Sequence, residues 1–423
     1  MTAPKPLEMD SSNSEPWLFP SWPVCADDEC AAAQRVLRSG RLNYWTGEEG
    51  RHFEREFAEA VGSAHAVAVA NGTVALELAL WALGIGPGDE VIVPCRTFIA
   101  TASAVVRCGA VPVFADIDRE SQNITSQTIR ERLSPRTKAL IAVHLAGWPC
   151  DMDPIMAVSR EHKLQVIEDC AQAHGALYRG RCVGTIGDVG AYSFCQDKIM
   201  TTAGEGGMLV TNRYDLWQRA WSFKDHGKSH DAVYNRQHAP GFRWLHERIG
   251  TNWRLTEVQS AIGRVVLGKL ESWVEARRRN ASILSECLAA LPAVRITLPP
   301  RDVRHSYYKY YFFIRPEALA PGWNRDRILA EIASAGIPCG TGSCSEIYRE
   351  LAFESSLRPT APLPVAQELG ATSLMLQVHP TLDEADMRRV ADAVSRVIHK
   401  AAADVHCGPF AHGANRVPLR QSA

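Results

Sequence analysis

Short apolar runs alternate with segments of helical periodicity between residues 60 and 212, and this alternation limits the chain to few folds. The runs with strand character are AHAVAVA (64–70), EVIVP (90–94), VPVFAD (111–116), ALIAVHL (139–145), LQVIED (164–169), VGAYSF (189–194) and GMLVT (207–211). The helical segments include Val74–Leu83, Phe98–Arg107, Ser126–Leu133 and Pro154–Lys163. The pattern predicts an α/β domain on a mostly parallel sheet, which places ligands at the carboxyl ends of its strands.

The remaining chain predicts a second, smaller α+β domain, because 423 residues are too many for one small core. A long helical stretch, roughly Leu255 to Leu291, leads into it. Its expected elements are a strand at 307–315, a helix around Arg325–Ala335, a strand at 374–380 and a helix from Asp383 to about Ala401. We therefore predict a flexible N-terminus (1–15), a large domain (16–275), a small C-terminal domain (276–402) and a disordered tail (403–423).

Composition and charge exclude several classes of function. The net charge of −1 argues against a surface for nucleic acid or anionic membrane. No run of about 18 apolar residues predicts a membrane span, and Met1–Pro20 lacks the apolar centre of a leader peptide. The twelve cysteines are scattered without a CxxC pair, so we expect reduced thiols, a cytoplasmic location and no metal site.

The first candidate for chemistry is Asn71-Gly72-Thr73, which follows a predicted strand and opens a predicted helix. Free backbone N–H groups and the helix dipole at such an N-terminus favour an anion, for example a phosphate. Taken alone, the pattern is also explained by Asn71 acting only as a helix N-cap.

The second candidate is IEDCAQAHG (167–175), where Asp169 stands at the end of an apolar strand. A carboxylate at the carboxyl edge of the sheet can keep the nitrogen of a pyridine ring protonated, which makes that ring an electron sink. Gln172 and His174 are candidates for the same pocket. A helix cap for the aspartate and a structural role for the histidine are the alternatives.

The third candidate is SFCQDKIMTTAGEGG (193–207), a segment of small and polar residues that contains one lysine, Lys198. A lysine that forms a Schiff base must be partly desolvated beside a cofactor carbonyl, because only its neutral amine is nucleophilic. The fourth candidate is GTNWRLTEVQSA (250–261), whose Asn252 and Arg254 can reach an anion across a subunit boundary. Taken alone, Lys198 is also explained as a solvated surface charge, and Asn252 and Arg254 as a helix cap and a surface charge.

Together these segments resemble the DegT/DnrJ/EryC1/StrS aminotransferases. The matching segments are NGTVALELAL, PCRTFIATASAV, VHLAGWPCDMD, VIEDCAQAHGA, GDVGAYSF, DKIMTTAGEGG and GTNWRLTEVQSAIG, in the family's order and across about residues 20–400. The resemblance implies the fold of the type I enzymes of pyridoxal 5'-phosphate (PLP). It also implies a transaminase that moves an amino group from glutamate or glutamine to a keto-sugar or related cyclic ketone.

The resemblance assigns roles to individual residues. Lys198 matches the Schiff-base lysine and Asp169 the partner of the pyridine nitrogen, while Gln172 lies near the ring or its phenolic oxygen. The other matching positions are the phosphate residues Gly72, Thr73 and Ser193, the ring-stacking residue Phe98, and Asn252 as a phosphate ligand given by the neighbouring subunit. The last role implies a homodimer with shared active sites.

The substrate follows less directly from the sequence. Arg96 departs from the family, which often has a small or hydrophobic residue there, and is either a surface residue or a contact for an anionic substrate group. His305 and Tyr308, in HSYYKYYFFI (305–314), are further candidates, with a core strand as the alternative. Arg96 and the basic segment Phe223–Arg243 favour a nucleotide-linked keto-sugar, which is anionic, over a cyclitol or aminoshikimate-type substrate.

Two other functions share features of this sequence. A PLP dehydratase of the same fold carries a histidine in place of the Schiff-base lysine, whereas this chain has Lys198. A non-enzymatic PLP-binding regulator would carry an added DNA-binding domain or lack the lysine, and residues 1–60 are too short and too weakly basic for such a domain. The sequence therefore favours the enzyme.

Overall fold

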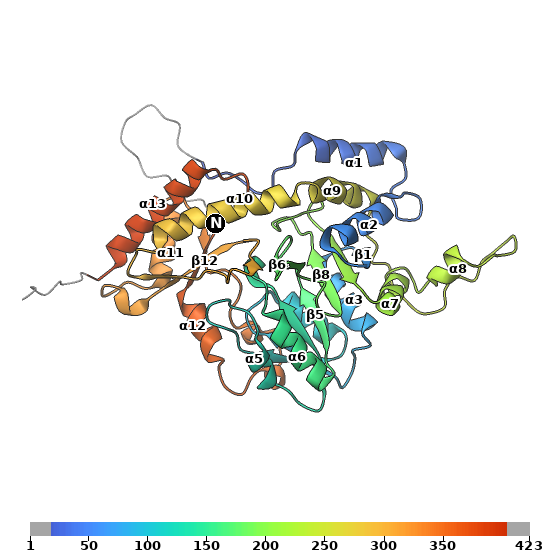
Figure 1. The fold of residues 1–423 in the computed structure, drawn as a ribbon, viewed down its shortest axis with the longest axis horizontal. Coiled ribbons are helices and arrows are strands. Elements are labelled where there is room, and N and C mark those ends of the chain that lie inside the picture. Colours follow the sequence, from blue (N-terminus) through green and yellow to red (C-terminus); the bar gives the residue numbers. More distant parts are fainter. Residues whose placement is uncertain (1–17, 404–423) are drawn as a thin grey trace, which may run out of the picture.

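A seven-stranded sheet forms the centre of the protein, whose computed structural model describes residues 18–403 (Figure 1). Its strands are β1 (His65–Val69), β2 (Glu90–Pro94), β3 (Val111–Ala115), β4 (Thr137–Val143), β5 (Gln165–Asp169), β8 (Val189–Ser193) and β9 (Gly207–Thr211), in the spatial order β1-β9-β8-β5-β4-β2-β3. The neighbours from β3 to β8 pair in parallel, and β9 runs antiparallel to both β8 and β1. Every strand expected between residues 64 and 211 is present, and the predicted α/β class is confirmed.

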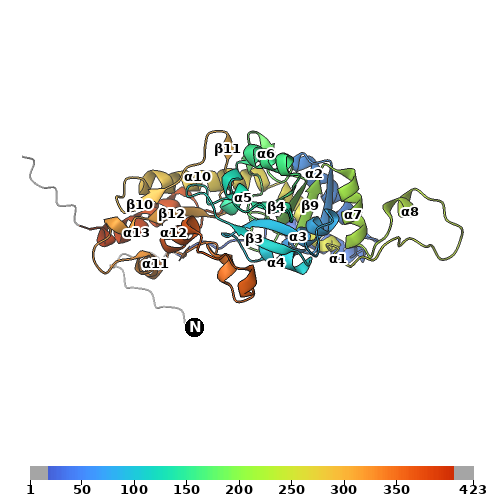
Figure 2. The ribbon, with the colours of Figure 1, turned by 90° about the horizontal axis from the view of Figure 1, so that it is seen from below.

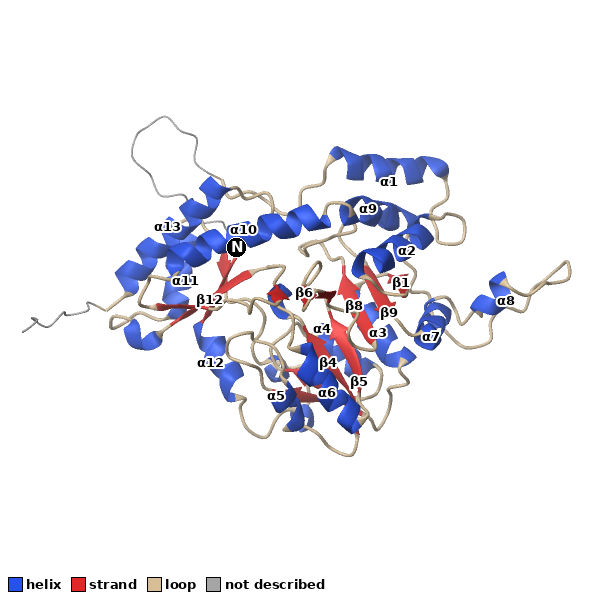
Figure 3. Ribbon diagram, in the orientation of Figure 1, coloured by secondary structure: helices blue, strands red, loops and turns tan. Residues whose placement is uncertain are grey.

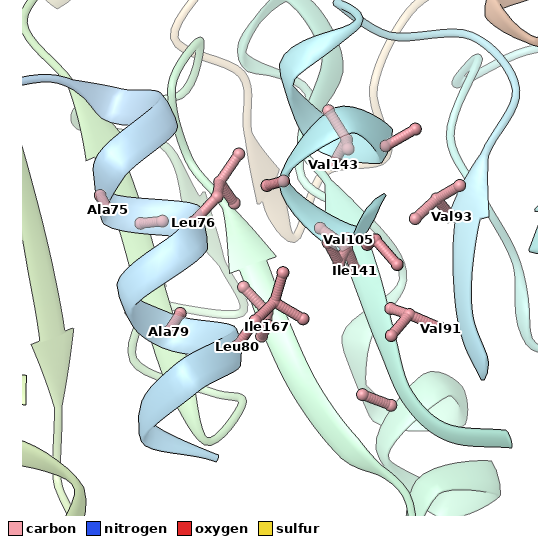
Figure 4. Packing of buried hydrophobic residues seen from close by; sticks show 14 of the residues in the cluster. Ala75, Leu76, Ala79, Leu80, Val91, Val93, Val105, Ile141, Val143 and Ile167 are labelled. Atoms are coloured by element: carbon pink, nitrogen blue, oxygen red, sulfur yellow. The ribbon is translucent and has the colours of Figure 1, made fainter. Parts of the chain in front are cut away.

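Helices cover both faces of this sheet, because alternate strand residues point to opposite sides. One face packs against α3 (Gly72–Ala82), α4 (Ala100–Arg107) and α7 (Tyr214–Lys224), and the other against α2 (Glu49–Val61), α5 (Ser126–Arg130), α6 (Met152–His162) and α9 (Glu257–Leu267). Figure 4 shows aliphatic side chains of the first face, with Leu80 of α3 beside Ile167 of β5. Since both faces are buried, the strands read as continuous apolar runs.

A second sheet lies at the other end of the molecule (Figure 3). Its strands β10 (Val294–Ile296), β12 (Tyr310–Ile314), β14 (Ser373–Leu376) and β13 (Cys339–Gly340) are all antiparallel. Residues from α10 (Leu270–Leu288), α11 (Arg325–Ser334) and α13 (Glu384–Ala401) share one apolar core with it. This is the expected mixture of helices and antiparallel strands, although β10 and β13 were not predicted because each is only two or three residues long.

The long helical stretch expected from Leu255 to Leu291 is instead two helices, α9 and α10. α9 ends at Leu267 with Gly268 as its C-cap, and the next residue, Lys269, forms ion pairs with Asp28 (2.6 Å) and Glu29 (2.8 Å) of α1 (Asp27–Ser39). Glycine is a weak helix former, so the break between the two helices falls at Gly268. As a result α9 belongs to the large sheet, and α10 runs on toward the small one (Figure 1).

The remaining elements are short. They are α8 (His230–Tyr234), α12 (Pro364–Thr372), a three-stranded sheet of β11 (Val303–Arg304), β6 (Leu177–Tyr178) and β7 (Arg181–Cys182), and the 3-10 turns Leu145–Gly147, Pro316–Ala318, Ile347–Arg349 and Ser355–Leu357. Within residues 18–403, no helix is long and apolar enough to cross a membrane. The predicted flexible N-terminus (1–15) and nearly all of the predicted tail lie outside the described residues, and the expected domain boundaries remain predictions.

Candidate active site

The carboxyl ends of β5 and β8 meet the N-terminus of α3 at one edge of the large sheet. Asp169 is the last residue of β5, Ser193 is the last of β8, and Gly72 is the first of α3. Gly207, the first residue of β9, is in register with both Ser193 and Val69. Residues that are far apart in the sequence are thus brought together by strand pairing.

The N-terminus of α3 approaches β8 so closely that only glycine fits. A Cβ on Gly72 would lie 2.5 Å from the Cβ of Ser193. The Asn71 side chain caps the N–H of Val74 (2.9 Å) and its carbonyl accepts from Ala75 (3.1 Å), so the N–H groups of Gly72 and Thr73 have no partner within the helix. Two free N–H groups, a helix dipole and the Ser193 hydroxyl make a cradle that suits a phosphate.

Asp169 supplies a buried carboxylate beside this cradle. Its Oδ2 accepts a hydrogen bond from Thr101 Oγ1 (2.9 Å), and its Oδ1 accepts from the N–H of Ala171 (3.1 Å). Thr101 is paired in turn with Thr97 (2.9 Å). Burial raises the pKa of the Asp169 carboxyl above its ordinary value, against the opposing effect of these hydrogen bonds and of the Lys198 charge. A cationic ring nitrogen would offset the cost of burying the charge.

Neighbouring groups hold Asp169 in place. Glu168 is fully buried, and its carboxylate accepts from the N–H groups of Gly184, Ile186 and Gly187 and from His144 Nε2 at distances of 2.6–3.0 Å. The carbonyl of Asp169 accepts from the N–H of His144 (3.1 Å). The end of β5 is therefore anchored on both sides.

Gln172 and His174 lie in the turn that follows β5. Gln172 Oε1 accepts from the N–H of Ala146 (2.8 Å), a residue with a left-handed backbone (φ 56°) in the turn after β4. His174 packs against the rings of Tyr192 and Phe194, and burial, with the Lys198 and Arg277 charges, lowers its pKa to about 3. His174 is therefore neutral, while Gln172 shapes the wall of the site.

Lys198 lies in the loop between β8 and β9. Its carbonyl accepts from Trp22 Nε1 (3.1 Å), and its Nζ lies 4.9 Å from the centre of the Tyr308 ring. Within the described chain, no hydrogen bond or ion pair holds its Nζ. The amine is thus half-buried, placed against an aromatic face, and free to react.

Phe98 and Asn252 face outward from this protomer. Phe98, between β2 and α4, is 66% exposed. Asn252 is also exposed, and its backbone pairs with that of Asp225. Both positions leave the side chain available to a ligand or to a second subunit.

The three candidate substrate residues lie in different surroundings. Arg96 is buried: its Nη2 donates to Ser373 Oγ (3.0 Å) and its guanidinium lies over the Tyr311 ring, so it is not the surface residue considered as one alternative. His305 is buried and stacked on Tyr307 with ring centres 3.8 Å apart, and burial lowers its pKa to about 3. Of the three, only Tyr308 contacts the lysine side chain.

A phosphate cradle, a buried carboxylate and an unpartnered lysine amine are together what PLP requires, so these residues could hold that cofactor. A sequence model of the DegT/DnrJ/EryC1/StrS aminotransferase family matches residues 23–395, and the chain belongs to that family. The predicted family, enzyme class and cofactor are thereby confirmed.

Relatives and solved structures agree with this assignment. The chain is 38% identical over 365 residues to GDP-perosamine synthase of Caulobacter vibrioides. The matched region covers 84% of this chain and 92% of that protein. It is 51% identical to the structure of an aminotransferase from Psychrobacter cryohalolentis, with a TM-score of 0.89, covering 90% of this chain and 99% of the other. It is 32% identical to the structure of 3-amino-5-hydroxybenzoic acid synthase, with a TM-score of 0.80, covering 90% and 99%.

Sequence reasoning missed several residues that build the site. Thr97 and Thr101 are four residues apart at the start of a predicted helix, and that spacing alone could have suggested a shared face. Trp22 lies 176 residues from Lys198 in the chain, and no local pattern links the two. Lys309 and Arg277, two cations that lie at Tyr308, stand in an apolar strand segment and in an Arg-rich helix, where the sequence pattern does not single them out.

We expect Gly72→Ala to weaken PLP binding, because the added methyl group would collide with Ser193 and push the helix N-terminus out of place. A tenfold or greater rise in the Kd of PLP, about 1.4 kcal/mol, should be seen by spectroscopic titration. Gly86→Ala is the matched control, since the nearest atom to its added Cβ is 3.9 Å away. An unchanged Kd for Gly72→Ala would show that this helix N-terminus does not bind the PLP phosphate.

We expect Asp169→Asn to stabilise the PLP-free protein near pH 7 while impairing catalysis. The raised pKa of Asp169 means that the folded state holds this proton more tightly than the unfolded state. Its contribution to stability is therefore complete below the ordinary carboxyl pKa and is lost as pH rises.

Thermal unfolding of the PLP-free protein tests the expectation. The gain in Tm of Asp169→Asn over the wild type should be present at pH 7 and should shrink toward about pH 4. The exposed Asp392→Asn should show no such gain. A lower Tm for Asp169→Asn at pH 7 would contradict the electrostatic argument.

Proposed function

We propose that this enzyme transfers an amino group from glutamate or glutamine to a nucleotide-linked keto-sugar, in the synthesis of an amino sugar for a polysaccharide or a glycosylated product. The observation that carries the proposal is the unpartnered amine of Lys198 beside the buried carboxylate of Asp169. GDP-perosamine synthase, whose name denotes a nucleotide-linked amino sugar, supports the substrate class.

The residues of the chain have separable tasks in this reaction. When bound, PLP supplies the carbonyl and the electron-withdrawing ring. Gly72, Thr73 and Ser193 would hold its phosphate, and Asp169 would keep a proton on its ring nitrogen. Lys198 Nζ would then take a proton from the amino-bearing carbon of the donor and return it to the former carbonyl carbon of the cofactor, as a general base and acid, a role worth about 10²–10⁴ in rate.

A cyclitol or aminoshikimate-type substrate remains the second candidate. It is supported by the similarity to 3-amino-5-hydroxybenzoic acid synthase, although the identity there, 32%, is below the 38% shared with the nucleotide-sugar enzyme. Tyr308 has the position that best supports a substrate contact. For Arg96 and His305 the proposal rests on the sequence, since both side chains are buried.

We also propose a homodimer in which Asn252 completes the partner's phosphate site. The segment that contains α8 projects from the body of the protein in both Figure 1 and Figure 2. It carries Phe242 and Trp244, which are 79% and 85% exposed and contact only each other among ring partners in the described chain. Large exposed aromatic side chains on an arm are suited to burial against a second copy.

A cytoplasmic location is part of the same proposal. Eleven cysteines of the described chain are free thiols, three of them buried. Free thiols persist where the surroundings are reducing.

Lys198→Ala tests the chemistry. We expect loss of the visible absorbance of the Schiff base and a fall in turnover of at least ~10²-fold, because both covalent attachment and proton transfer are removed. The exposed Lys138→Ala should behave as the wild type. A panel of GDP-, UDP- and dTDP-linked keto-sugars and keto-cyclitols would identify the acceptor, and normal turnover in Lys198→Ala would refute the assignment.

Mixed dimers test the shared site. Inactive Lys198→Ala and Asn252→Ala subunits, unfolded together and refolded, should recover about one quarter of wild-type activity. Half of the dimers would be hybrids, and one of the two sites in each hybrid would have both residues intact. If Asn252 served its own subunit, every site in the mixture would lack one residue and no recovery would occur.

A further inference from the structure

Positive charge gathers around Tyr308, on the side of Lys198 that faces the small sheet. The ammonium groups of Lys198 and Lys309 lie 4.9 and 4.7 Å from the centre of the Tyr308 ring. Arg277, on α10, donates from Nη1 to the Tyr308 carbonyl (3.2 Å). Three cationic side chains from three different segments therefore surround one aromatic residue.

Negative charge in this cluster is scarce among the described residues. Asp197 is the carboxylate there, and its Oδ2 lies 3.9 Å from Lys309 Nζ. The same oxygen also accepts a hydrogen bond from the Tyr308 hydroxyl, and the Asp197 side chain is 55% exposed. Asp169 offsets the charge of Lys198, and the half-exposed Asp197 does not balance both Lys309 and Arg277. Uncompensated buried charge is costly.

Arg277 contributes most to this imbalance. It is only 1% exposed, and its Nε and Nη2 have no hydrogen-bond partner in the described chain. Its guanidinium lies 5.0 Å from the ring centre of Trp22, so an aromatic face rather than an anion covers it. An anion bound nearby would offset the charge that the protein leaves unpaired.

Lys309 offers the contact that such an anion needs. Its side chain keeps 12% of its surface accessible, and its Nζ donates to Gln377 Oε1 (2.8 Å). An ammonium group has three donors, so at least one N–H remains for a ligand. The PLP phosphate does not require it, because that group has its own cradle at Gly72, Thr73 and Ser193.

We infer that Lys309, with the charge of Arg277 behind it, binds a carboxylate group of a substrate next to Lys198. The inference rests on the proposed aminotransferase function and adds a specificity subsite to it. A carboxylate reaches this site from two sources, the amino-acid donor or an acidic keto-sugar. Both would place their reacting carbon near the lysine amine while an N–H···O bond of Lys309 holds the carboxylate.

The pH dependence of binding follows from the same cluster. Burial lowers the pKa of Lys309 to about 8, with Asp197 opposing and the other cations adding to the effect. Lys309 is therefore cationic below about pH 8 and neutral above it, so carboxylate affinity should fall between pH 7 and pH 9. The charged or titratable groups that face Lys309 are Asp197, Lys198, Arg277, Tyr308 and His379, of which His379 is neutral because burial and these cations lower its pKa to about 3.

Calorimetric titration of the PLP-loaded enzyme with glutarate tests the subsite. Glutarate has two carboxylates and no amine, so its binding does not depend on amino transfer. We expect Lys309→Met to raise its Kd at least tenfold, Lys309→Arg to stay within about threefold of the wild type, and the exposed Lys138→Met to have no effect. Equal affinity in Lys309→Met and the wild type would overturn the inference, as would equal losses in Lys309→Met and Lys309→Arg.

Separate half-reactions identify the source of the carboxylate. If the donor binds there, Lys309→Met should raise the glutamate concentration needed for half-maximal bleaching of the Schiff-base absorbance, with acceptor amination unchanged. If the acceptor binds there, amination of a keto-sugar acid should weaken while that of the neutral keto-sugar does not. Unchanged affinity in both half-reactions would overturn the inference even though transfer continues, whereas absence of transfer in the wild type would refute the proposed function instead.

Discussion

The contact between the first turn of α3 and the end of β8 is the constraint on which the site depends. Gly72 has no room for a Cβ above Ser193, so the helix N-terminus can rest directly on the strand end. That approach places two free N–H groups beside the Ser193 hydroxyl, at the sheet edge where β5 delivers Asp169. The arrangement works because parallel strands end together and their crossover helices begin at the same edge.

The rest of the site is organised by buried charge. The carboxylate of Asp169 is buried, and hydrogen bonds from Thr101 and from the backbone N–H of Ala171 stabilise its charged form. The nearby Lys198 adds an opposite charge. On the other side of the lysine, Arg277 and Lys309 leave positive charge without an equal number of carboxylates. Such groups cost stability in the free protein, and this cost is typical of sites prepared for charged ligands.

Much of the large domain could be predicted because its strands are buried on both faces and its helices are regular. The seven apolar runs became seven strands, and the motifs around Asp169 and Lys198 fell at the expected strand ends. Short or irregular elements could not be predicted: β13 has two residues, and the break after Gly268 depends on an ion pair with α1 as well as on the glycine. The burial of Arg96 depends on Ser373, 277 residues later.

The sequence by itself determined the chemistry: a lysine, an aspartate and a glycine turn at strand ends, in an order that marks the family. These are local features, because periodicity and turn residues act over a few positions. Only the tertiary structure decided which distant side chains enclose that chemistry. Trp22 on the Lys198 carbonyl, Thr101 on Asp169, and the cations around Tyr308 come from separate segments that meet only when the two sheets and α10 pack together. Their surroundings, and hence their charge states, are properties of the packed molecule.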